Sequence, residues 1–270
     1  GSVEIWDLSD TGRPQLVLRS LKQEVLELGY SQDDRLLAAS DTSGKMAVWD
    51  TATGELRYVL AGHIATAIDF SPDGQTLATA GLDGTVRVWR ALPQEYGELL
   101  TLPADPAISD LELSPDNKLL AMGSVIGPAT IRDANTGDLL LTLPGEPDSG
   151  VYSVAFRPDG TQIATVGADN VIRIWDLTSG EVLLSWTGHE EARTPFVSGV
   201  LNVSYSPDGM RLATAGVDGV AKVWDASSGE ELLVLAGHTD RIHSIAYSPD
   251  GRYIATSSGN VGASIKVWDA

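Results

Sequence analysis

The chain has 270 residues, of which 43% are hydrophobic and 20% charged, which fits one large all-β domain or two smaller globular domains. It contains no cysteine, so disulfides, zinc–thiolate sites and thiol catalysis are excluded. The net charge of −19, without a cluster of Lys and Arg, argues against nucleic acid and anionic membranes as partners. Since disulfides are absent, a cytoplasmic location is our expectation.

The chain opens with GSVEIWDL, which matches DGTVRVWR of residues 83–90 from its glycine onward. A sequence segment that elsewhere ends a repeat therefore begins the chain. We predict a strand at 3–7 and another at 15–19. Both belong to a sheet that lacks its two inner strands, so we expect its edge to stay open or to meet another molecule.

From residue 31 onward, Ser-Pro-Asp-Gly or a close variant recurs six times, at intervals of 40 to 49 residues. In the most regular repeat, strands are predicted in GELRYVLAGH, ATAIDF, TLATAG and TVRVW, because Val, Ile, Leu and Thr favour strands. Pro-Asp-Gly and Asp-Gly between them predict tight turns. The small apolar residues of LATA and its relatives indicate strands that are covered on both faces.

Each repeat has four predicted strands, with Gly-His before the second strand and Trp-Asp after the fourth. In these features the whole chain resembles the WD-repeat β-propeller family. The resemblance implies an all-β propeller of four-stranded antiparallel blades in a single domain, 1–270. A partial blade at 1–20 precedes repeats that end near residues 50, 90, 133, 176, 225 and 269. A seven-bladed parent would need two more strands ahead of Gly1, and this chain would then be part of a longer protein. In the alternative six-bladed ring, strand 15–19 pairs with strand 264–268.

The family resemblance also assigns the histidines. In such repeats an Asp, a His, a Thr and a Trp form a buried hydrogen-bonded chain that joins neighbouring elements. The matching positions are His63, Asp83, Thr79 and Trp89; His189, Asp218, Thr214 and Trp224; His238, Thr256 and Trp268, with Asn260 nearest to the missing Asp; and Thr165, Asp169 and Trp175. A Ser/Thr–His–Asp group also occurs in hydrolases, but recurrence at the repeat spacing favours a structural network and no catalytic residue.

Alignment on the Ser-Pro-Asp-Gly turns places three outward positions per repeat on one face, formed by the loops where such proteins commonly bind partners. These rim positions are Glu24, Leu26, Thr42; Ile64, Thr66, Leu82; Ala107, Ser109, Val125; Gly150, Tyr152, Ala168; Gly199, Leu201, Val217; and Arg241, His243, Gly259. Many are apolar, so they either form an interaction patch or are covered by neighbouring loops. With a long loop at 189–206, they predict partner contacts at Tyr152, Phe196, Leu201, Arg241, His243, Leu26, Leu82 and Arg193.

Two functional classes follow. The first is a non-catalytic scaffold or sensor module that binds a protein or peptide, similar to propellers of bacterial multidomain signalling proteins. The second is a propeller enzyme with a site in the central channel, for which Glu27, Asp69, Asp110 and Glu112 are the candidate side chains. These four carboxylates are too scattered in the sequence to favour an enzyme. Neither a cofactor nor a metal is expected.

Overall fold

The computed structural model describes residues 2–7, 13–91, 97–103, 107–147, 149–190, 199–259 and 264–270. These residues form 25 strands and no helix, so the described part of the chain has no helix that could cross a membrane. The strands belong to two compact units. Unit 1 comprises residues 1–113 and 134–137, and unit 2 comprises residues 114–133 and 138–270.

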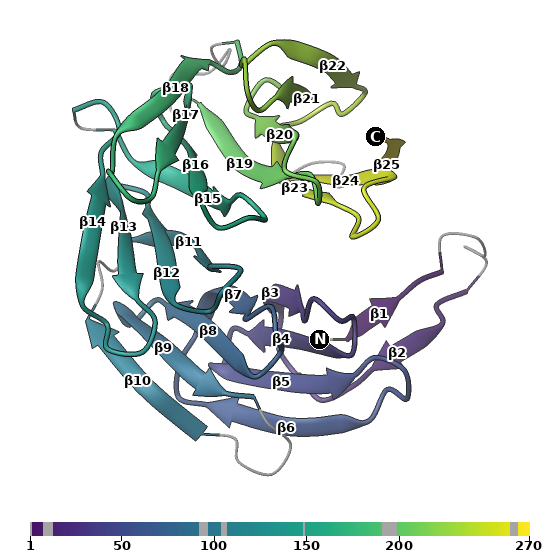
Figure 1. Ribbon diagram of the computed structural model, residues 1–270. Coiled ribbons are helices and arrows are strands. Elements are labelled where there is room, and N and C mark those ends of the chain that lie inside the picture. Colours follow the sequence, from purple (N-terminus) through teal and green to yellow (C-terminus); the bar gives the residue numbers. More distant parts are fainter. Residues whose placement is uncertain are drawn as a thin grey trace. The chain divides into compact units, whose positions relative to one another are not determined.

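Unit 1 begins with a two-stranded antiparallel sheet and continues with two four-stranded ones (Figure 1). Each sheet follows the chain from strand to adjacent strand. The strands are β1 (Val3–Ile5) and β2 (Leu16–Leu18); β3 (Val25–Tyr30), β4 (Leu36–Asp41), β5 (Lys45–Asp50) and β6 (Leu56–Ala61); β7 (Ala65–Phe70), β8 (Thr76–Gly81), β9 (Thr85–Arg90) and β10 (Gly97–Pro103); and β11 (Ile108–Leu113).

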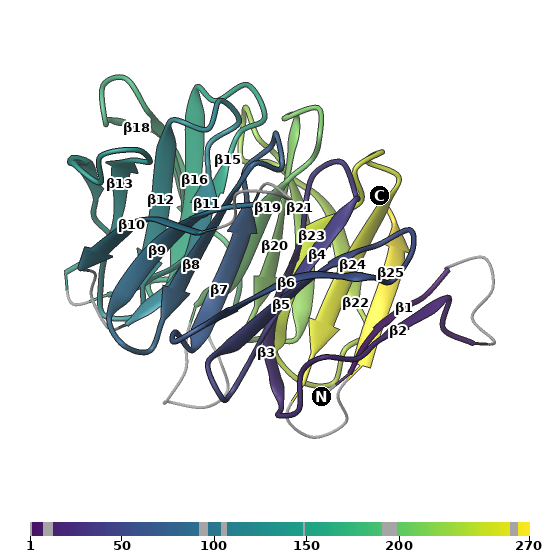
Figure 2. The same cartoon turned by 90° about the horizontal axis from the view of Figure 1, so that it is seen from below.

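Unit 2 departs from the pattern of separate four-stranded sheets, because the strands of two successive repeats pair through Ser124 and Val151 and form one continuous sheet. Its strands are β12 (Leu119–Ser124), β13 (Gly127–Asp133) and β14 (Leu139–Leu143); β15 (Val151–Phe156), β16 (Gln162–Gly167), β17 (Val171–Asp176) and β18 (Val182–Thr187); β19 (Val200–Tyr205), β20 (Arg211–Gly216), β21 (Val220–Asp225) and β22 (Glu231–Ala236); and β23 (Ile242–Tyr247), β24 (Tyr253–Ser258) and β25 (Ser264–Asp269). The last sheet has three strands, which lie side by side in Figures 1 and 2.

The Ser-Pro-Asp-Gly turns fold identically because their side chains bond within the turn. In the turn at 71–74, the Ser71 hydroxyl donates to Asp73 Oδ1 at 2.7 Å and accepts from the Thr76 amide at 2.8 Å. Gly74 has a φ of +65°, which a glycine adopts without strain. The same Ser–Asp bond recurs at Ser206–Asp208 and elsewhere. The motif therefore fixes where each first strand ends and each second strand begins.

The core of each unit lies between successive sheets. The tryptophan that ends the third strand of one sheet packs against the third strand of the sheet before it. Trp89 thus shares a buried hydrophobic cluster with Met46 and Val48, and Trp224 shares one with Ile172 and Ile174. Both rings are almost fully buried, and burying an aromatic ring contributes about 1.5–3 kcal/mol.

These observations confirm the all-β fold of antiparallel four-stranded sheets. The sheet of the first two strands is also two-stranded as predicted, although the strands are shorter than 3–7 and 15–19. The single domain over residues 1–270 and the number of blades stay predictions.

Candidate functional site

A β-bulge interrupts the same strand of five repeats, the one that precedes the Ser-Pro-Asp-Gly turn or its variant, at the same place. The pairing skips one residue between the first and third residues of β3, β7, β15, β19 and β23. The skipped residues are Leu26, Thr66, Tyr152, Leu201 and His243. A bulge removes a residue from the ladder and changes the direction of its side chain. These five residues are the middle rim positions that the sequence predicts.

At four of the five bulges, those of β3, β7, β15 and β19, the other two rim positions bond to each other. The amide of the third position donates to the carbonyl of the first. This bond joins Thr42 to Glu24 at 3.0 Å, Leu82 to Ile64 at 3.1 Å, Ala168 to Gly150 at 3.0 Å and Val217 to Gly199 at 3.3 Å. We call such a set of three residues a rim triplet. Its backbone is constant from sheet to sheet, while its side chains differ.

In unit 2, hydrogen bonds between neighbouring first strands bring three rim triplets together. The Ser153 hydroxyl on β15 accepts from Asn202 Nδ2 at 3.1 Å and from the Val203 amide at 3.3 Å. Asn202 Oδ1 in turn accepts from the Ile245 amide on β23 at 2.9 Å. Ser153 and Asn202 directly follow the bulge residues Tyr152 and Leu201 in the sequence. The bulge residues of β15, β19 and β23 therefore lie on adjacent strands.

Glycine allows the close approach of backbones beside these triplets. A Cβ at Gly150 would lie 1.9 Å from the Val125 carbonyl oxygen, and a Cβ at Gly199 would lie 2.0 Å from that of Gly167. Gly199 also has a φ of +101°, which other residues rarely adopt. A larger residue at either position would have to move the backbone.

The apolar rim residues differ in solvent exposure. Leu26, Leu82 and Val125 are exposed, whereas Ile64, Tyr152, Leu201 and Val217 are half-buried. Among the polar candidates, His243 is exposed and Arg241 is half-buried. Burial raises the pKa of Tyr152. Arg193, Phe196 and Asn260 lie outside the described residues.

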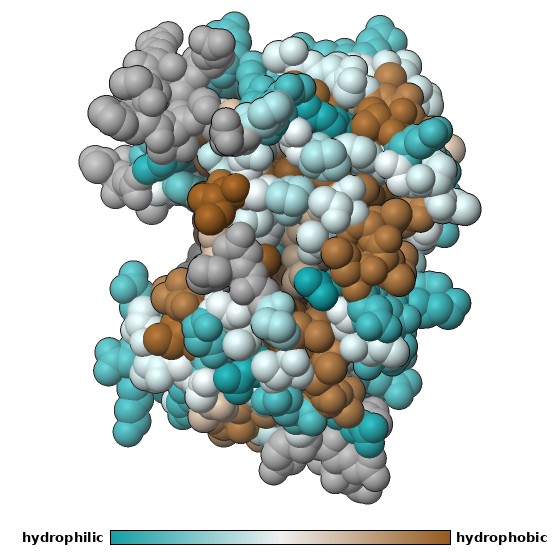
Figure 3. Space-filling model, turned by 90° about the vertical axis from the view of Figure 1, so that its left-hand side faces the viewer, coloured by the Kyte–Doolittle hydropathy of each residue, from teal (hydrophilic) through white to brown (hydrophobic). Residues whose placement is uncertain are grey.

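Exposed apolar residues also occur away from the rim. Leu139 and Leu140 on β14 and Val182 and Leu183 on β18 are each about half exposed. Figure 3 views the side of the molecule that carries β14, and apolar patches alternate there with hydrophilic ones. Exposure alone therefore does not identify the rim; the repeated bulge does.

The histidines form hydrogen-bonded networks. His189 Nδ1 lies 3.1 Å from Asp218 Oδ2, and its Nε2 lies 2.8 Å from the Thr214 hydroxyl. The Trp224 indole donates to the same hydroxyl at 2.8 Å. Burial acts to raise the pKa of Asp218, but the hydrogen bond and the charge of His189, together with the hydrogen bonds from the Val220 and Glu190 amides, outweigh it and lower that pKa.

The two sets that lack one of the four network residues form other hydrogen bonds. His238 contacts Ser264 at 3.0 Å and Thr256 at 2.7 Å, and the Trp268 indole donates to Thr256 at 2.9 Å. The hydroxyl of Ser264 thus stands where other sets have an Asp. In the set without a histidine, the Trp175 indole donates to Thr165 at 2.8 Å, while Asp169 binds Arg173 at 2.6 Å.

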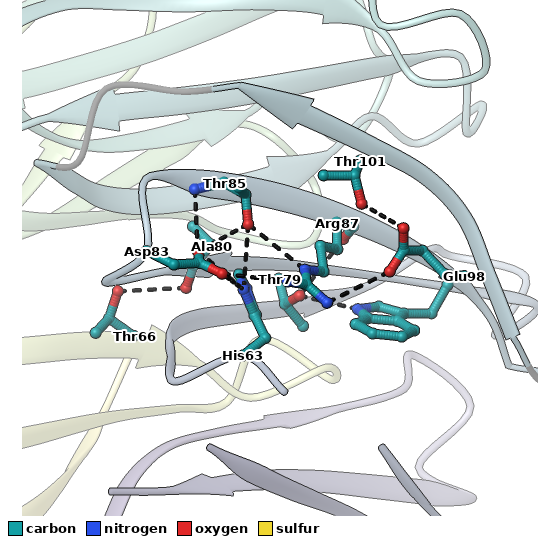
Figure 4. Close-up of polar contacts among 10 residues, drawn as sticks. His63, Thr66, Thr79, Ala80, Asp83, Thr85, Arg87, Glu98 and Thr101 are labelled. Carbon is teal, nitrogen blue, oxygen red and sulfur yellow. Dashed lines mark hydrogen bonds and ion pairs between the residues drawn. The ribbon is translucent and has the colours of Figure 1, made fainter. Parts of the chain in front are cut away.

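The His63 set departs from the predicted network (Figure 4). Nδ1 lies 3.2 Å from Asp83, but the expected bond to Thr79 is not formed, and Nε2 is buried without a partner among the described residues. Thr79 still accepts from the Trp89 indole at 2.9 Å. Asp83 is shared with Arg87 at 3.2 Å, so its carboxylate does not belong to the histidine alone. Burial opposes ionisation of Asp83, yet hydrogen bonds from Thr85 and His63 lower its pKa to about 2.

The first repeat contains a buried acid that sequence reasoning missed. Asp41 ends β4 fully buried, and its Oδ1 accepts from the Ser43 amide at 2.9 Å. The aligned residues Gly81 and Gly216 face histidine rings, which a Cβ would approach to 2.3 Å. The first repeat has no such histidine. The Asp41 carboxylate can therefore occupy this position, where a side chain in the other two repeats would collide with the histidine ring. The signal was present in the sequence, as LAASD in place of LATAG.

Three of the four carboxylates proposed for an enzyme are closer together than the sequence suggests. Asp69 on β7 accepts from the Leu113 amide on β11 at 2.7 Å. Burial raises the pKa of Asp69 and of Glu27 to about 7 each, and the charge of Asp110 contributes to both shifts. No group of three or more acidic or histidine side chains in the described ranges could hold a metal ion. The contact of Asp69 bridges two strands, as Asn202 does in unit 2.

Comparison with known proteins is consistent with this geometry. The model of the "WD domain, G-beta repeat" family matches residues 54–90, 137–176, 180–225 and 229–269, which is more than half of the chain. One similar protein is Protein groucho of Drosophila melanogaster, 40% identical over 91 residues. That match covers 33% of this chain and 12% of groucho.

Proposed function

Since the chain belongs to the WD40 repeat family, we propose that it is a non-catalytic scaffold or sensor module that binds a protein or peptide through the rim triplets of unit 2. The rim triplets carry this proposal: a constant backbone presents side chains that vary from sheet to sheet. Repeated turns such as Ser-Pro-Asp-Gly offer the same groups in every repeat and cannot specify one partner. Variable side chains on a fixed backbone can.

The chemistry of these triplets fits a peptide better than a small molecule. Tyr152, Leu201 and His243 provide an aromatic, an aliphatic and an imidazole side chain on adjacent strands, and Arg241 adds a cation. Aromatic side chains and arginine are enriched among the residues that dominate protein interfaces. The net charge of −19 supports protein over nucleic acid or membrane as the partner. We extend the proposal to a cytoplasmic module of a bacterial-type multidomain signalling protein.

An enzyme remains the second candidate, and one observation favours it. Asp69 and Glu27 have pKa values near 7, a range suited to proton transfer at neutral pH. However, Asp69 holds the Leu113 amide and Glu27 holds the Leu28 amide at 3.1 Å. Both carboxylates therefore have structural hydrogen bonds, so we rank the binding module first.

The test is an alanine scan against the native partner, once affinity purification has identified one. Tyr152, Leu201, Arg241 and His243 are changed singly, and Met210→Ala on an exposed Ser-Pro-Asp-Gly turn serves as the matched control. We expect at least one rim variant to lose about 2 kcal/mol of binding free energy, as interface anchors do, and the control to lose none. If all four rim variants bind within about 0.5 kcal/mol of the wild type while turn variants abolish binding, the proposal is wrong.

A further inference from the structure

A pocket lies between two successive sheets of unit 1, next to the turns that end β3 and β7. Its volume is about 240 Å³, and its lining comes from the turns at 31–34 and 71–74, from β6 and from Ala91. The rim triplets lie at the opposite ends of β3 and β7, so the pocket is a separate site. Sites for free small molecules usually measure about 300–1,000 Å³, so a single side chain of a partner suits this volume better.

The floor of the pocket is apolar. Leu36, Tyr58 and Ala91 line it. Tyr58 and Ala91 belong to the buried hydrophobic cluster that includes Trp89, and the half-buried Leu36 packs against that cluster. An apolar side chain that enters the pocket therefore extends the core of unit 1. An aromatic ring gains most from this, because it buries the largest apolar area.

The strand β6 differs from the other outer strands at this pocket. Its pairing with β5 skips Arg57, and Tyr58 follows. At the same two positions, β10, β14, β18 and β22 each have two leucines, which are Leu99 and Leu100, Leu140 and Leu141, Leu183 and Leu184, and Leu232 and Leu233. The turns beside the pocket recur in every repeat, but the arginine and the tyrosine do not. The pocket can therefore specify a partner although its turns cannot.

Two arginines line the pocket beside its apolar floor. Arg57 donates to Asp50 Oδ2 at 2.5 Å, which holds the guanidinium in place and lowers the pKa of Asp50 to about 2. Arg35 is exposed and lines the same pocket. A guanidinium is attracted to the face of an aromatic ring. An aromatic side chain in the pocket is therefore favoured over an aliphatic one.

The surroundings of the pocket are acidic. Asp33 and Asp73 line it, and each accepts from the serine two residues earlier in its turn at 2.7 Å. This bond lowers the pKa of Asp33, so its carboxylate is charged at neutral pH. With Asp34, Asp50 and Glu55, these turns have five acidic side chains beside the two arginines. Basic residues on either side of an aromatic residue would therefore be attracted to the turns.

We propose that this pocket binds an aromatic side chain of a partner protein, in a segment that has basic residues on both sides of it. The ring packs on Leu36, Tyr58 and Ala91, and the basic neighbours pair with the turn aspartates. A second copy of this chain is a poor occupant, since both copies have a net charge of −19 and repel each other. The site is independent of the rim triplets, so the proposed function can fail without it and it can fail without the proposed function.

The experiment uses the capped peptide Lys-Gly-Phe-Gly-Lys as the probe. Its binding to the isotope-labelled 270-residue protein is followed by the NMR shifts of the Leu36, Gly74 and Gln75 amides. We expect saturable shifts centred on these residues. Alanine in place of the phenylalanine should weaken binding about tenfold, because the floor loses its apolar contact. Glutamates in place of the lysines should also weaken it, because like charges then meet.

Two protein variants test the lining. Arg57→Leu introduces the leucine of the other outer strands and should weaken binding about fivefold. Asp73→Asn should weaken it about threefold, and an amide oxygen can still accept from Ser71 and Gln75 within the turn. Asp116→Asn is the matched control, because Asp116 has the same bond to a turn serine at 2.8 Å but does not line the pocket. It should leave the affinity unchanged.

Tryptophan fluorescence checks that each variant is folded, and the peptide series keeps the test decisive if Arg57→Leu is less stable. The proposal is overturned if the shifts do not saturate or if they spread evenly over the turns of all repeats. Equal binding of the phenylalanine and alanine peptides would show attraction to the acidic surface alone. Equal losses for Asp73→Asn and Asp116→Asn would have the same meaning. A dimer of the 270-residue protein that Arg57→Leu dissociates would show that a second copy occupies the pocket.

Discussion

The two units use different chemistry for the same bond between neighbouring first strands. In unit 1 a carboxylate, Asp69, accepts from the next strand at Leu113. In unit 2 an amide, Asn202, and a hydroxyl, Ser153, accept from the next strand, at positions two residues earlier along their own strands than Asp69. The histidine networks also differ: that of His189 is complete, and that of His63 is open at Nε2. The geometry of a repeat thus does not fix its sensitivity to pH or to substitution; the identity and neighbours of the bridging groups do.

The largest effect should come from breaking the complete network. His189→Ala leaves Asp218 and Thr214 without their shared partner, and each buried orphan costs about 1–3 kcal/mol, so we expect a loss of about 3 kcal/mol. His63→Ala or Asp83→Ala should cost about 1 kcal/mol, because that network is already open and Asp83 is partly exposed. Urea unfolding measures both. His243→Ala, exposed and outside both networks, is the control, and equal losses for His189 and His63 would contradict the comparison.

The second effect concerns pH. The pKa of Asp69 and of Glu27 is raised by burial to about 7, above ordinary values of 3.8 and 4.5. The folded protein therefore binds these protons more tightly than the unfolded chain. This contribution to stability is complete below about pH 4 and is lost as the pH rises through 7. Between pH 5 and pH 8 we expect the free energy of unfolding to fall by about 2 kcal/mol for Asp69.

Asp69→Asn should remove most of that fall, because an amide oxygen still accepts from Leu113 and does not titrate. Denaturant melts at pH 5 and pH 8 compare the variant with the wild type. Asp116→Asn, an exposed turn aspartate whose pKa is already lowered by Lys118 and Ser114, is the control and should keep the wild-type fall. A variant with the same pH dependence as the wild type would show that Asp69 does not carry the effect.

The smallest effect should come from placing the chemistry of unit 1 in unit 2. In Asn202→Asp, the carboxylate still accepts from Ile245 but no longer donates to Ser153. We expect a loss of about 1 kcal/mol at pH 8, because one hydrogen bond is missing, and a smaller loss at pH 5. Asn202→Ala loses both bonds without gaining a charge and separates the two causes. If the loss were independent of pH, burial in unit 2 would not raise the pKa of the new carboxyl.

The sequence predicted the elements well because each repeat carries its own turn signals. ATAIDF and TLATAG are β7 and β8 to the residue, bounded by Ser-Pro-Asp-Gly and by the Asp-Gly turn. The rim triplets followed from alignment to the same turns. The bridges between sheets did not, because Asp69, Asn202 and Ser153 occupy positions where the repeats differ, and no period points to them.

The histidine sets show a second limit of sequence reasoning. His63 and His189 have the same three partner residue types in the sequence (Asp, Thr and Trp), yet only one network closes. In the His63 set, Arg87 and Thr85, which are not part of the motif, also bind Asp83. A motif specifies which groups are present, but their competing neighbours decide which bonds form.

The bulge gives the rim a practical use. Because the skipped residue pairs with nothing across the strand, its replacement leaves the register of the sheet unchanged. Tyr152, Leu201 and His243 can therefore be varied together as a small library while the surrounding framework keeps its hydrogen bonds. A collection of such variants would be a display scaffold, from which binders for chosen peptides are selected without redesigning the fold.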